Sequence, residues 1–110
     1  MKPHLFQILL ALADQDRHGL AIMRDVLDRT EGRMHLWPGM LYGALKELVE
    51  GELAVEKRPP RDGKAGGGKP RYYGITDRGR KALAAETERL DRYVQAARAR
   101  NVLKPVGPRG

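Results

Sequence analysis

Apolar side chains recur every three or four residues through the first fifty positions of the chain, the spacing of one face of an α-helix. Residues 3–13 predict a first helix that begins at Pro3, where the missing N–H of proline would be unpaired in any case. Residues 18–30 predict a second helix, and Gly32 follows it as a stop signal. Residues 38–50 predict a third. Three helices therefore precede the first strand.

The third predicted helix has two unlike sides. Leu41, Leu45 and Leu48 form an apolar stripe down one side, which we expect to be buried. The other side is expected to face solvent and carries Gly39, Tyr42, Gly43 and Lys46. A helix with one buried face can present its other face to a partner.

Two short strands follow the third helix. Residues 53–58 predict the first strand, ended by two prolines, and residues 71–75 predict the second, which is rich in residues that suit a pleated surface. The segment 61–69 between them contains four glycines and several basic residues, so we expect a flexible connection. The pattern predicts a basic β-hairpin. Tyr72 and Tyr73 alternate across its second strand, so one ring should pack inward and the other outward.

A long helix is expected over residues 77–101, with Thr76 as its N-cap. Spacings of four and three residues, typical of a helix–helix seam, relate Leu83, Thr87, Leu90, Val94 and Ala97. Because Thr87 is polar and Ala97 is small, we expect this seam to share its burial with other elements. Residues 102–110 are expected to form a disordered tail.

The order of three helices, two strands and a helix is that of a winged helix-turn-helix domain. We therefore expect a mainly α fold with a small β-hairpin. Residues 1–76 would form the winged domain, and residues 77–101 a C-terminal dimerisation helix. In winged helix-turn-helix proteins the third helix enters the major groove of DNA and the wing contacts the neighbouring backbone.

Charge adds a partner class to this picture. The 110 residues carry a net charge of +7, but residues 1–52 carry −2, residues 53–82 carry +6 and residues 83–110 carry +3. Most of the excess therefore lies in the predicted wing. A polyanion is the natural partner of such a patch, and double-stranded DNA is the one we expect. The alternative is a loop whose charge only keeps the protein soluble.

Composition excludes several other classes. The chain has no Cys, which removes disulfides and thiolate chemistry, and no apolar run approaches the ~20 residues that a membrane span requires. No signal peptide is recognised, so we expect a cytoplasmic protein. His4, His18 and His35 lie in separate elements, and we expect no metal and no cofactor. His18 is better explained as a residue that either caps the second helix or packs against it.

One motif resembles a phosphate-binding loop and is rejected. Residues 63–69 match the first seven positions of the P-loop pattern, but the eighth is Pro70, where Ser or Thr would hold Mg²⁺. A strand follows instead of a helix, so no helix N-terminus would face a phosphate. No catalytic constellation is recognised elsewhere, and we expect that the protein is not an enzyme.

The chain resembles the PadR family of bacterial transcriptional regulators. The matching segments are residues 18–22 (HGLAI), 38–42 (PGMLY) with Ala44 and Leu45, 51–53 (GEL), and 68–76 (GKPRYYGIT) with Gly79. The resemblance implies a homodimeric DNA-binding regulator, usually a repressor, that binds a near-palindromic operator. The single C-terminal helix resembles the shorter members of the family.

Some positions depart from the family pattern. Met40 stands where the family most often has Thr, which removes a hydroxyl that could bond to phosphate. Pro70 and Gly74 replace residues that are often basic, and Leu20 replaces a common Tyr. The resemblance nevertheless places Gly39 and Tyr42 toward DNA.

Residue by residue, two candidate sets follow. The DNA-binding set comprises Gly39, Met40, Tyr42, Gly43, Lys46, Lys64, Lys69 and Arg71. The dimerisation set comprises Leu5, Phe6, Leu9, Leu83, Thr87, Leu90, Val94 and Ala97. Because members of the family can bind small molecules near the dimer centre, Trp37 is a candidate wall of an effector pocket. The alternative that we favour is a ring that anchors the start of the third helix.

Two other functions remain open at this stage. A winged domain can act as a protein-interaction module without reading DNA sequence, although charge concentrated in the wing argues against it. An RNA-binding role would fit the basic patch, but stacking aromatics are scarce outside Tyr72 and Tyr73.

Overall fold

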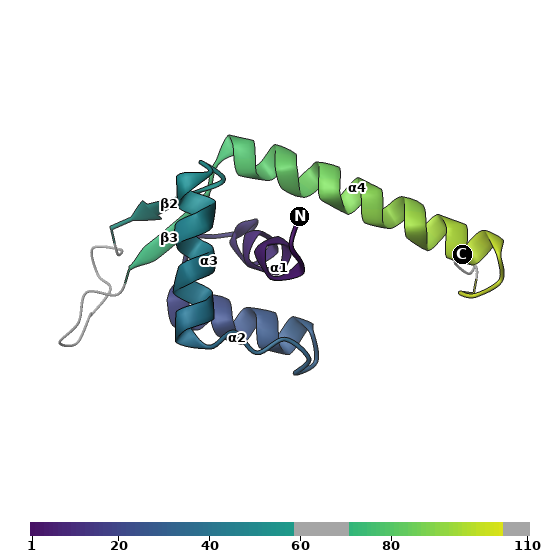
Figure 1. Cartoon of the computed structure of the whole chain (residues 1–110), viewed down its shortest axis with the longest axis horizontal. Coiled ribbons are helices and arrows are strands. Elements are labelled where there is room, and N and C mark those ends of the chain that lie inside the picture. Colours follow the sequence, from purple (N-terminus) through teal and green to yellow (C-terminus); the bar gives the residue numbers. More distant parts are fainter. Residues whose placement is uncertain (59–70, 105–110) are drawn as a thin grey trace.

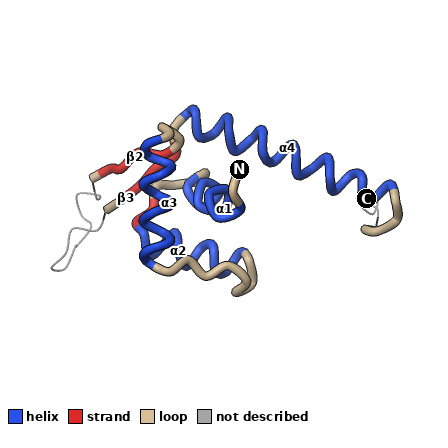
Figure 2. The backbone as a smooth tube through the Cα atoms, viewed as in Figure 1, coloured by secondary structure: helices blue, strands red, loops and turns tan. Residues whose placement is uncertain are grey.

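The computed structural model describes residues 1–58 and 71–104, and its backbone is drawn in Figures 1 and 2. In chain order the elements are α1 (Pro3–Leu12), β1 (Arg17–His18), α2 (Gly19–Arg29), α3 (Pro38–Glu50), β2 (Ala54–Lys57), β3 (Tyr72–Ile75) and α4 (Asp77–Ala99). The expected mainly helical fold with a small antiparallel sheet is confirmed.

The hydrophobic core is built around α1. Five of its ten residues are buried, and α2, α3, α4 and β3 all pack against it. The core residues are Leu5, Ile8, Leu9, Ala11, Leu12, Ile22, Val26, Leu36, Leu41, Ala44, Leu45, Leu48, Ala54, Tyr73 and Leu83. Full burial of one such large apolar side chain stabilises the fold by about 1.5–3 kcal/mol. The broad apolar arc of residues 3–13 thus reflects burial against several neighbours.

The sheet has three strands in the order β1-β3-β2, so the prediction of a two-stranded hairpin is incomplete. The missed strand is β1, in which Arg17 pairs with Tyr73 and His18 with Tyr72. Two residues are too few to show alternation, and only their pairing with β3 makes them a strand. The other two strands were expected and are slightly shorter, since Arg58 and Arg71 lie outside them.

Left-handed residues end three of the helices. After α2 the expected stop residue Gly32 is one of them, with a φ of 80°, and it follows another, Glu31. Glu31, Glu52 and Asn101 have φ values of 54°, 61° and 62°. After α3, the N–H of Leu53 donates to the carbonyl of Leu48 at 2.9 Å, which is the long hydrogen bond of a Schellman motif. The same bond after α4 runs from Val102 to Ala97 at 2.9 Å.

The C-terminal helix ends at Ala99, two residues earlier than expected. Residues 102–104, which we expected to belong to a disordered tail, turn back along the helix, and Arg98 donates to the carbonyl of Lys104 at 3.3 Å. Residues 105–110, the remainder of that expected tail, lie outside the described residues.

Trp37 does not anchor the start of α3, contrary to expectation. Its ring is 64% exposed and stacks on His35, with 4.0 Å between ring centroids. Leu36 is the fully buried residue at this point and holds the chain against the core.

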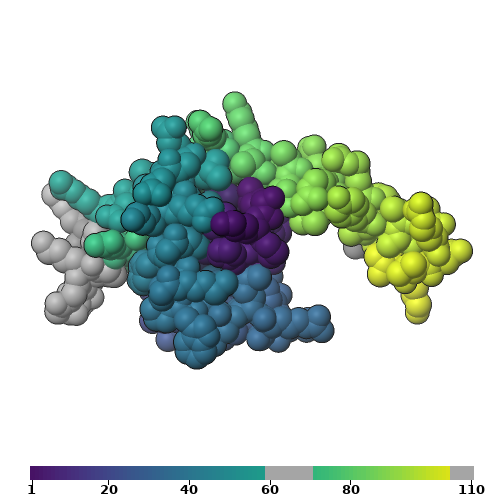
Figure 3. Space-filling model, viewed as in Figure 1, coloured from purple at the N-terminus to yellow at the C-terminus, as the bar shows by residue number. Residues whose placement is uncertain are grey.

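The molecule is elongated. It measures 53 × 30 × 26 Å with a radius of gyration of 16.4 Å, whereas a compact domain of this length has about 13 Å. Figure 3 shows why: the C-terminal half of α4 projects beyond the body formed by the other elements. No helix in residues 1–58 or 71–104 is long and apolar enough to cross a membrane.

The junction of α3, β2 and α4 depends on a glycine. Thr76 caps α4 by accepting from the N–H of Gly79 at 2.9 Å and donates to the carbonyl of Glu52 at 2.7 Å. A Cβ at Gly79 would lie 2.8 Å from a side-chain carbon of Ile75 and would clash with the backbone carbonyl of Leu53. The backbones of α4 and residue 53 can therefore approach only because residue 79 has no side chain.

We expect Gly79→Ala to lower the free energy of unfolding by about 1–3 kcal/mol, because backbone atoms must shift to admit the methyl group. Urea denaturation followed by circular dichroism measures this loss. An unchanged unfolding midpoint would show that the junction can relax without cost.

Candidate nucleic-acid interface

The two sides of α3 are as different in the structure as in the sequence. Leu41, Ala44, Leu45 and Leu48 are buried against the core. The outward face is exposed and carries Gly39, Met40, Tyr42, Gly43 and Lys46. The packing of the inner face therefore fixes which residues the helix presents to a partner.

Two glycines leave the outward face of α3 bare. Within the described residues nothing lies within 4 Å of a Cβ built at Gly39 or Gly43. Neither glycine has a positive φ, so neither is required by backbone conformation. Glycine inside a helix is unfavourable by roughly 0.5–1 kcal/mol relative to alanine. Their presence at these open positions suits a partner that approaches the helix backbone closely.

Tyr42 lies across the start of α2. A Cβ at Gly19 would be 2.9 Å from the ring carbon that bears the hydroxyl group of Tyr42, and closer still to that hydroxyl. Gly19 therefore leaves the space that the ring fills. The side chain remains 44% exposed. This contact holds the phenol at a defined place between the two helices.

His18 joins α2 to the sheet. Its Nδ1 accepts a hydrogen bond from the N–H of Ala21 at 3.1 Å, which confirms the expected helix cap. Its ring meets Tyr72 edge to face, with centroids 5.5 Å apart. Tyr73 is buried while Tyr72 is half-buried, so the expectation of one inward and one outward ring on this strand is confirmed.

Ion pairs restrain two basic side chains of the wing, one on β2 and one just before β3. Lys57 contacts Asp16 at 3.0 Å, and Arg71 contacts Glu56 at 3.9 Å. All four side chains are between about two-fifths and two-thirds exposed. Exposed pairs of this kind contribute only about 0–1 kcal/mol, so a phosphate can displace the carboxylates at little cost.

A cleft of about 250 Å³ separates α3 from the wing strands. It is lined by Tyr42, Leu45, Lys46, Val49, Glu50, Glu56, Arg71 and Tyr73. Burial raises the pKa of the Tyr73 phenol, and a hydrogen bond with Arg71 opposes part of this rise. The phenol therefore stays neutral at physiological pH, and among the described lining residues the charges belong to Lys46, Glu50, Glu56 and Arg71.

The structure brings most of the expected DNA-binding residues to one side of the chain. Lys46 and Arg71 line the same cleft, and the other α3 residues share the outward face of the helix. Lys64 and Lys69 lie outside the described residues. The sequence did not single out Asp16, and it placed Gly19 in the family motif of residues 18–22 without predicting its contact with Tyr42. Both contacts are with side chains far away in the chain.

The expected dimerisation residues divide into two groups. Leu5, Leu9 and Leu83 are buried within the single chain, and Leu9 is 0% exposed, so these residues support the core rather than an outer surface. Phe6 is partly buried against the same core. On α4, Thr87 and Leu90 are exposed, while Val94 and Ala97 are half-buried.

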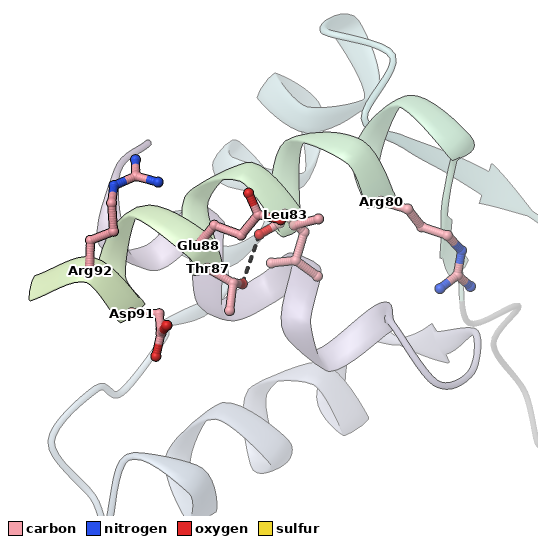
Figure 4. Close-up of a pocket in the computed structure, with 7 residues that line it drawn as sticks. Arg80, Leu83, Thr87, Glu88, Asp91 and Arg92 are labelled. Carbon is pink, nitrogen blue, oxygen red and sulfur yellow. Dashed lines mark hydrogen bonds between the residues drawn. The ribbon is translucent and has the colours of Figure 1, made fainter. Parts of the chain in front are cut away.

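An open groove of about 710 Å³ runs along α4. It is lined by Arg80, Leu83, Ala84, Thr87, Glu88, Asp91 and Arg92. Figure 4 shows these side chains spaced along the helix, with the Thr87 hydroxyl donating to the Leu83 carbonyl at 2.7 Å. Trp37 lines neither this groove nor the cleft beside α3, so its candidate role in an effector pocket gains no support.

Solved structures share this fold. A PadR family transcription regulator from Clostridium difficile superposes with a TM-score of 0.70 at 21% identity, covering 90% of this chain and 97% of that chain. A transcriptional regulator from Clostridium thermocellum gives 0.70 at 19% identity, with 86% of each chain covered. Bacillus subtilis PadR in complex with operator DNA gives 0.66 at 17% identity, covering 78% of this chain and 47% of that chain. No curated protein matches the chain in sequence.

The fold and the exposed third helix define a winged-helix protein. The sequence model of the transcriptional regulator PadR-like family matches residues 8–85, which span α1 to the first half of α4. The chain belongs to this family, and the resemblance stated from its motifs is confirmed.

We expect Gly43→Ala to raise the free energy of unfolding by about 0.5–1 kcal/mol, since the added methyl group meets no described atom and alanine favours the helix. Chemical denaturation of Gly43→Ala and Gly79→Ala side by side provides the test. The two variants make the same substitution, one where the methyl group has open space and one where it does not. A loss of stability at residue 43 would mean that this glycine serves the fold itself.

Proposed function

We propose that the protein is a homodimeric transcriptional regulator, most simply a repressor, that binds a near-palindromic DNA operator. The outward face of α3 reads the major groove, and the basic wing contacts the flanking backbone. The function is binding rather than catalysis. The observation that carries it is the bare, glycine-containing face of α3 beside a segment with a net charge of +6.

Charge and shape support DNA over other partners. Lys57 on β2 and Arg71 just before β3 form exposed ion pairs that phosphates can replace. The acidic residues of α3, Glu47 and Glu50, lie in the C-terminal half of the helix. Its N-terminal half is therefore the part suited to approach DNA, as in other recognition helices.

The two halves of α4 differ in what they contact, and this difference supports a dimer. The first half is fastened to its own chain: Arg80 donates to the Ala13 carbonyl at 3.0 Å, and Glu86 lies 3.7 Å from the N-terminal ammonium of Met1. A hydrogen bond from Arg89 holds the pKa of Glu86 below its ordinary value, so this carboxylate stays charged.

The second half of α4 extends for about 20 Å beyond residue 86. It exposes Leu90 and Tyr93 there, beside half-buried Val94 and Ala97. A second copy of the chain would bury this surface. It would also place two recognition helices about a two-fold axis, which requires a near-palindromic operator.

Fluorescence anisotropy tests the proposal directly. The labelled duplexes are the region upstream of the protein's own gene and a scrambled duplex of equal composition, each at two salt concentrations. Tight, salt-sensitive binding that prefers the native sequence is expected. Equal and weak binding to both duplexes would instead support the interaction-module alternative.

The double variant Lys69→Ala with Arg71→Ala should weaken operator binding and flatten its salt dependence. If each side chain neutralises one phosphate, a dimer loses four contacts, and the slope of log K against log salt becomes less negative by about 3–4. Lys81→Ala with Arg100→Ala, which removes the same charge from α4 and its C-cap, is the matched control. Equal slopes for the two double variants would contradict the assigned role of the wing.

Leu90→Glu with Val94→Glu should convert the dimer to a monomer and abolish tight operator binding, because charged side chains would be buried at the interface. Sedimentation velocity measures the mass and circular dichroism checks the fold. Ala85→Glu with Ala99→Glu, on the opposite side of α4, is the control and should remain dimeric. A dimer that survives the first pair of substitutions would place the interface elsewhere.

A further inference from the structure

Met40 is an exposed apolar side chain in the first turn of α3. It is 44% exposed and lies between Gly39 and Gly43, whose outward sides are bare. Tyr42, in the same stretch, is held over Gly19 at the start of α2. Lys46 follows six residues later, about 9 Å further along the helix axis.

The chemistry of methionine restricts what Met40 can recognise. Its side chain has no N–H or O–H donor, and the thioether sulfur is only a weak acceptor. It therefore cannot form the paired hydrogen bonds that distinguish guanine, adenine or cytosine in the major groove. The one major-groove group that offers an apolar contact is the C5-methyl group of thymine.

The position of Met40 fits this contact. Pro38 is the first residue of α3, so Met40 lies in its first turn, and base edges are usually contacted by the N-terminal residues of a recognition helix. The missing side chains at Gly39 and Gly43 allow the helix backbone to come close to the base pairs. A flexible, unbranched side chain can then lie against a methyl group at the floor of the groove.

We propose that Met40 selects thymine in each operator half-site through van der Waals contact with its C5-methyl group. This inference rests on the proposed DNA-binding function and specifies the chemistry of its readout. It also gives a physical consequence to the departure from the Thr that the family most often has at this position: an apolar contact with a base replaces a polar contact with the backbone.

Deoxyuridine provides the sharpest test, because it differs from thymidine only by the absent methyl group. Each thymine of the bound promoter duplex is replaced in turn, and anisotropy titrations compare wild type, Met40→Ala and Met40→Leu. At one or two symmetric positions we expect deoxyuridine to weaken wild-type binding about fourfold, the factor for one buried methyl-sized group. Met40→Ala should lose most of this discrimination, and Met40→Leu should keep it.

Salt separates this contact from the wing. The wild-type ratio between thymine and deoxyuridine duplexes should be the same at both salt concentrations, since an apolar contact releases no counterions. Because Met40 is exposed, all three proteins should unfold at the same urea concentration.

The outcomes distinguish the two levels of the proposal. A preferred promoter duplex whose deoxyuridine versions all bind wild type equally well would overturn the role of Met40 and leave DNA binding intact. Equal losses for wild type and Met40→Ala would do the same. A wild-type protein that prefers no duplex would overturn both the readout and the proposed function.

Discussion

The structure depends on the burial of α1. This helix has α2, α3, α4 and β3 packed around it, and Ile8 and Leu9 at its centre are fully buried. Because so many elements share one short helix, none of them can rotate independently. The outward direction of α3, the position of the wing and the departure angle of α4 are all set by how they fit against the same apolar surface.

Glycines show where this chain is constrained from within and where it is not. At Gly19, Gly74 and Gly79 a Cβ would collide with the side chains of Tyr42 and Asp16 and the backbone of Leu53 respectively, so these glycines leave room where distant segments meet. At Gly39 and Gly43 a Cβ would meet nothing among the described residues. Glycine there weakens the helix without helping the fold, which is the pattern expected where stability is given up for function.

The long α4 unites two requirements in one element. Its first half completes the core through Leu83, and its second half leaves that core and exposes apolar residues such as Leu90. Because the first half of α4 is fixed to the core, the direction of its free second half relative to α3 is fixed as well. Any partner that binds the free half is thereby placed at a fixed angle to α3.

The sequence by itself determined the order of the four helices and of the strands β2 and β3, the bounds of the helices to within about two residues, and the two faces of α3. These features follow from local signals: apolar periodicity, prolines at the first helical position, and the caps at His18 and Thr76. The family motifs, also local, were sufficient for the fold and for the side of α3 that carries the candidate site.

Only the tertiary structure decided the features that join distant segments. The strand β1 exists because residues 17 and 18 pair with β3, more than fifty residues away. Tyr42 packs against Gly19, which belongs to a different helix. Hydrophobicity alone would place Trp37 inside, but it stays exposed because the neighbouring Leu36 fills the core instead. Leu83 and Leu90 belong to the same predicted seam on one face of α4, yet Leu83 is buried and Leu90 is exposed. Periodicity determines which face a residue occupies, but only packing in three dimensions determines what covers that face.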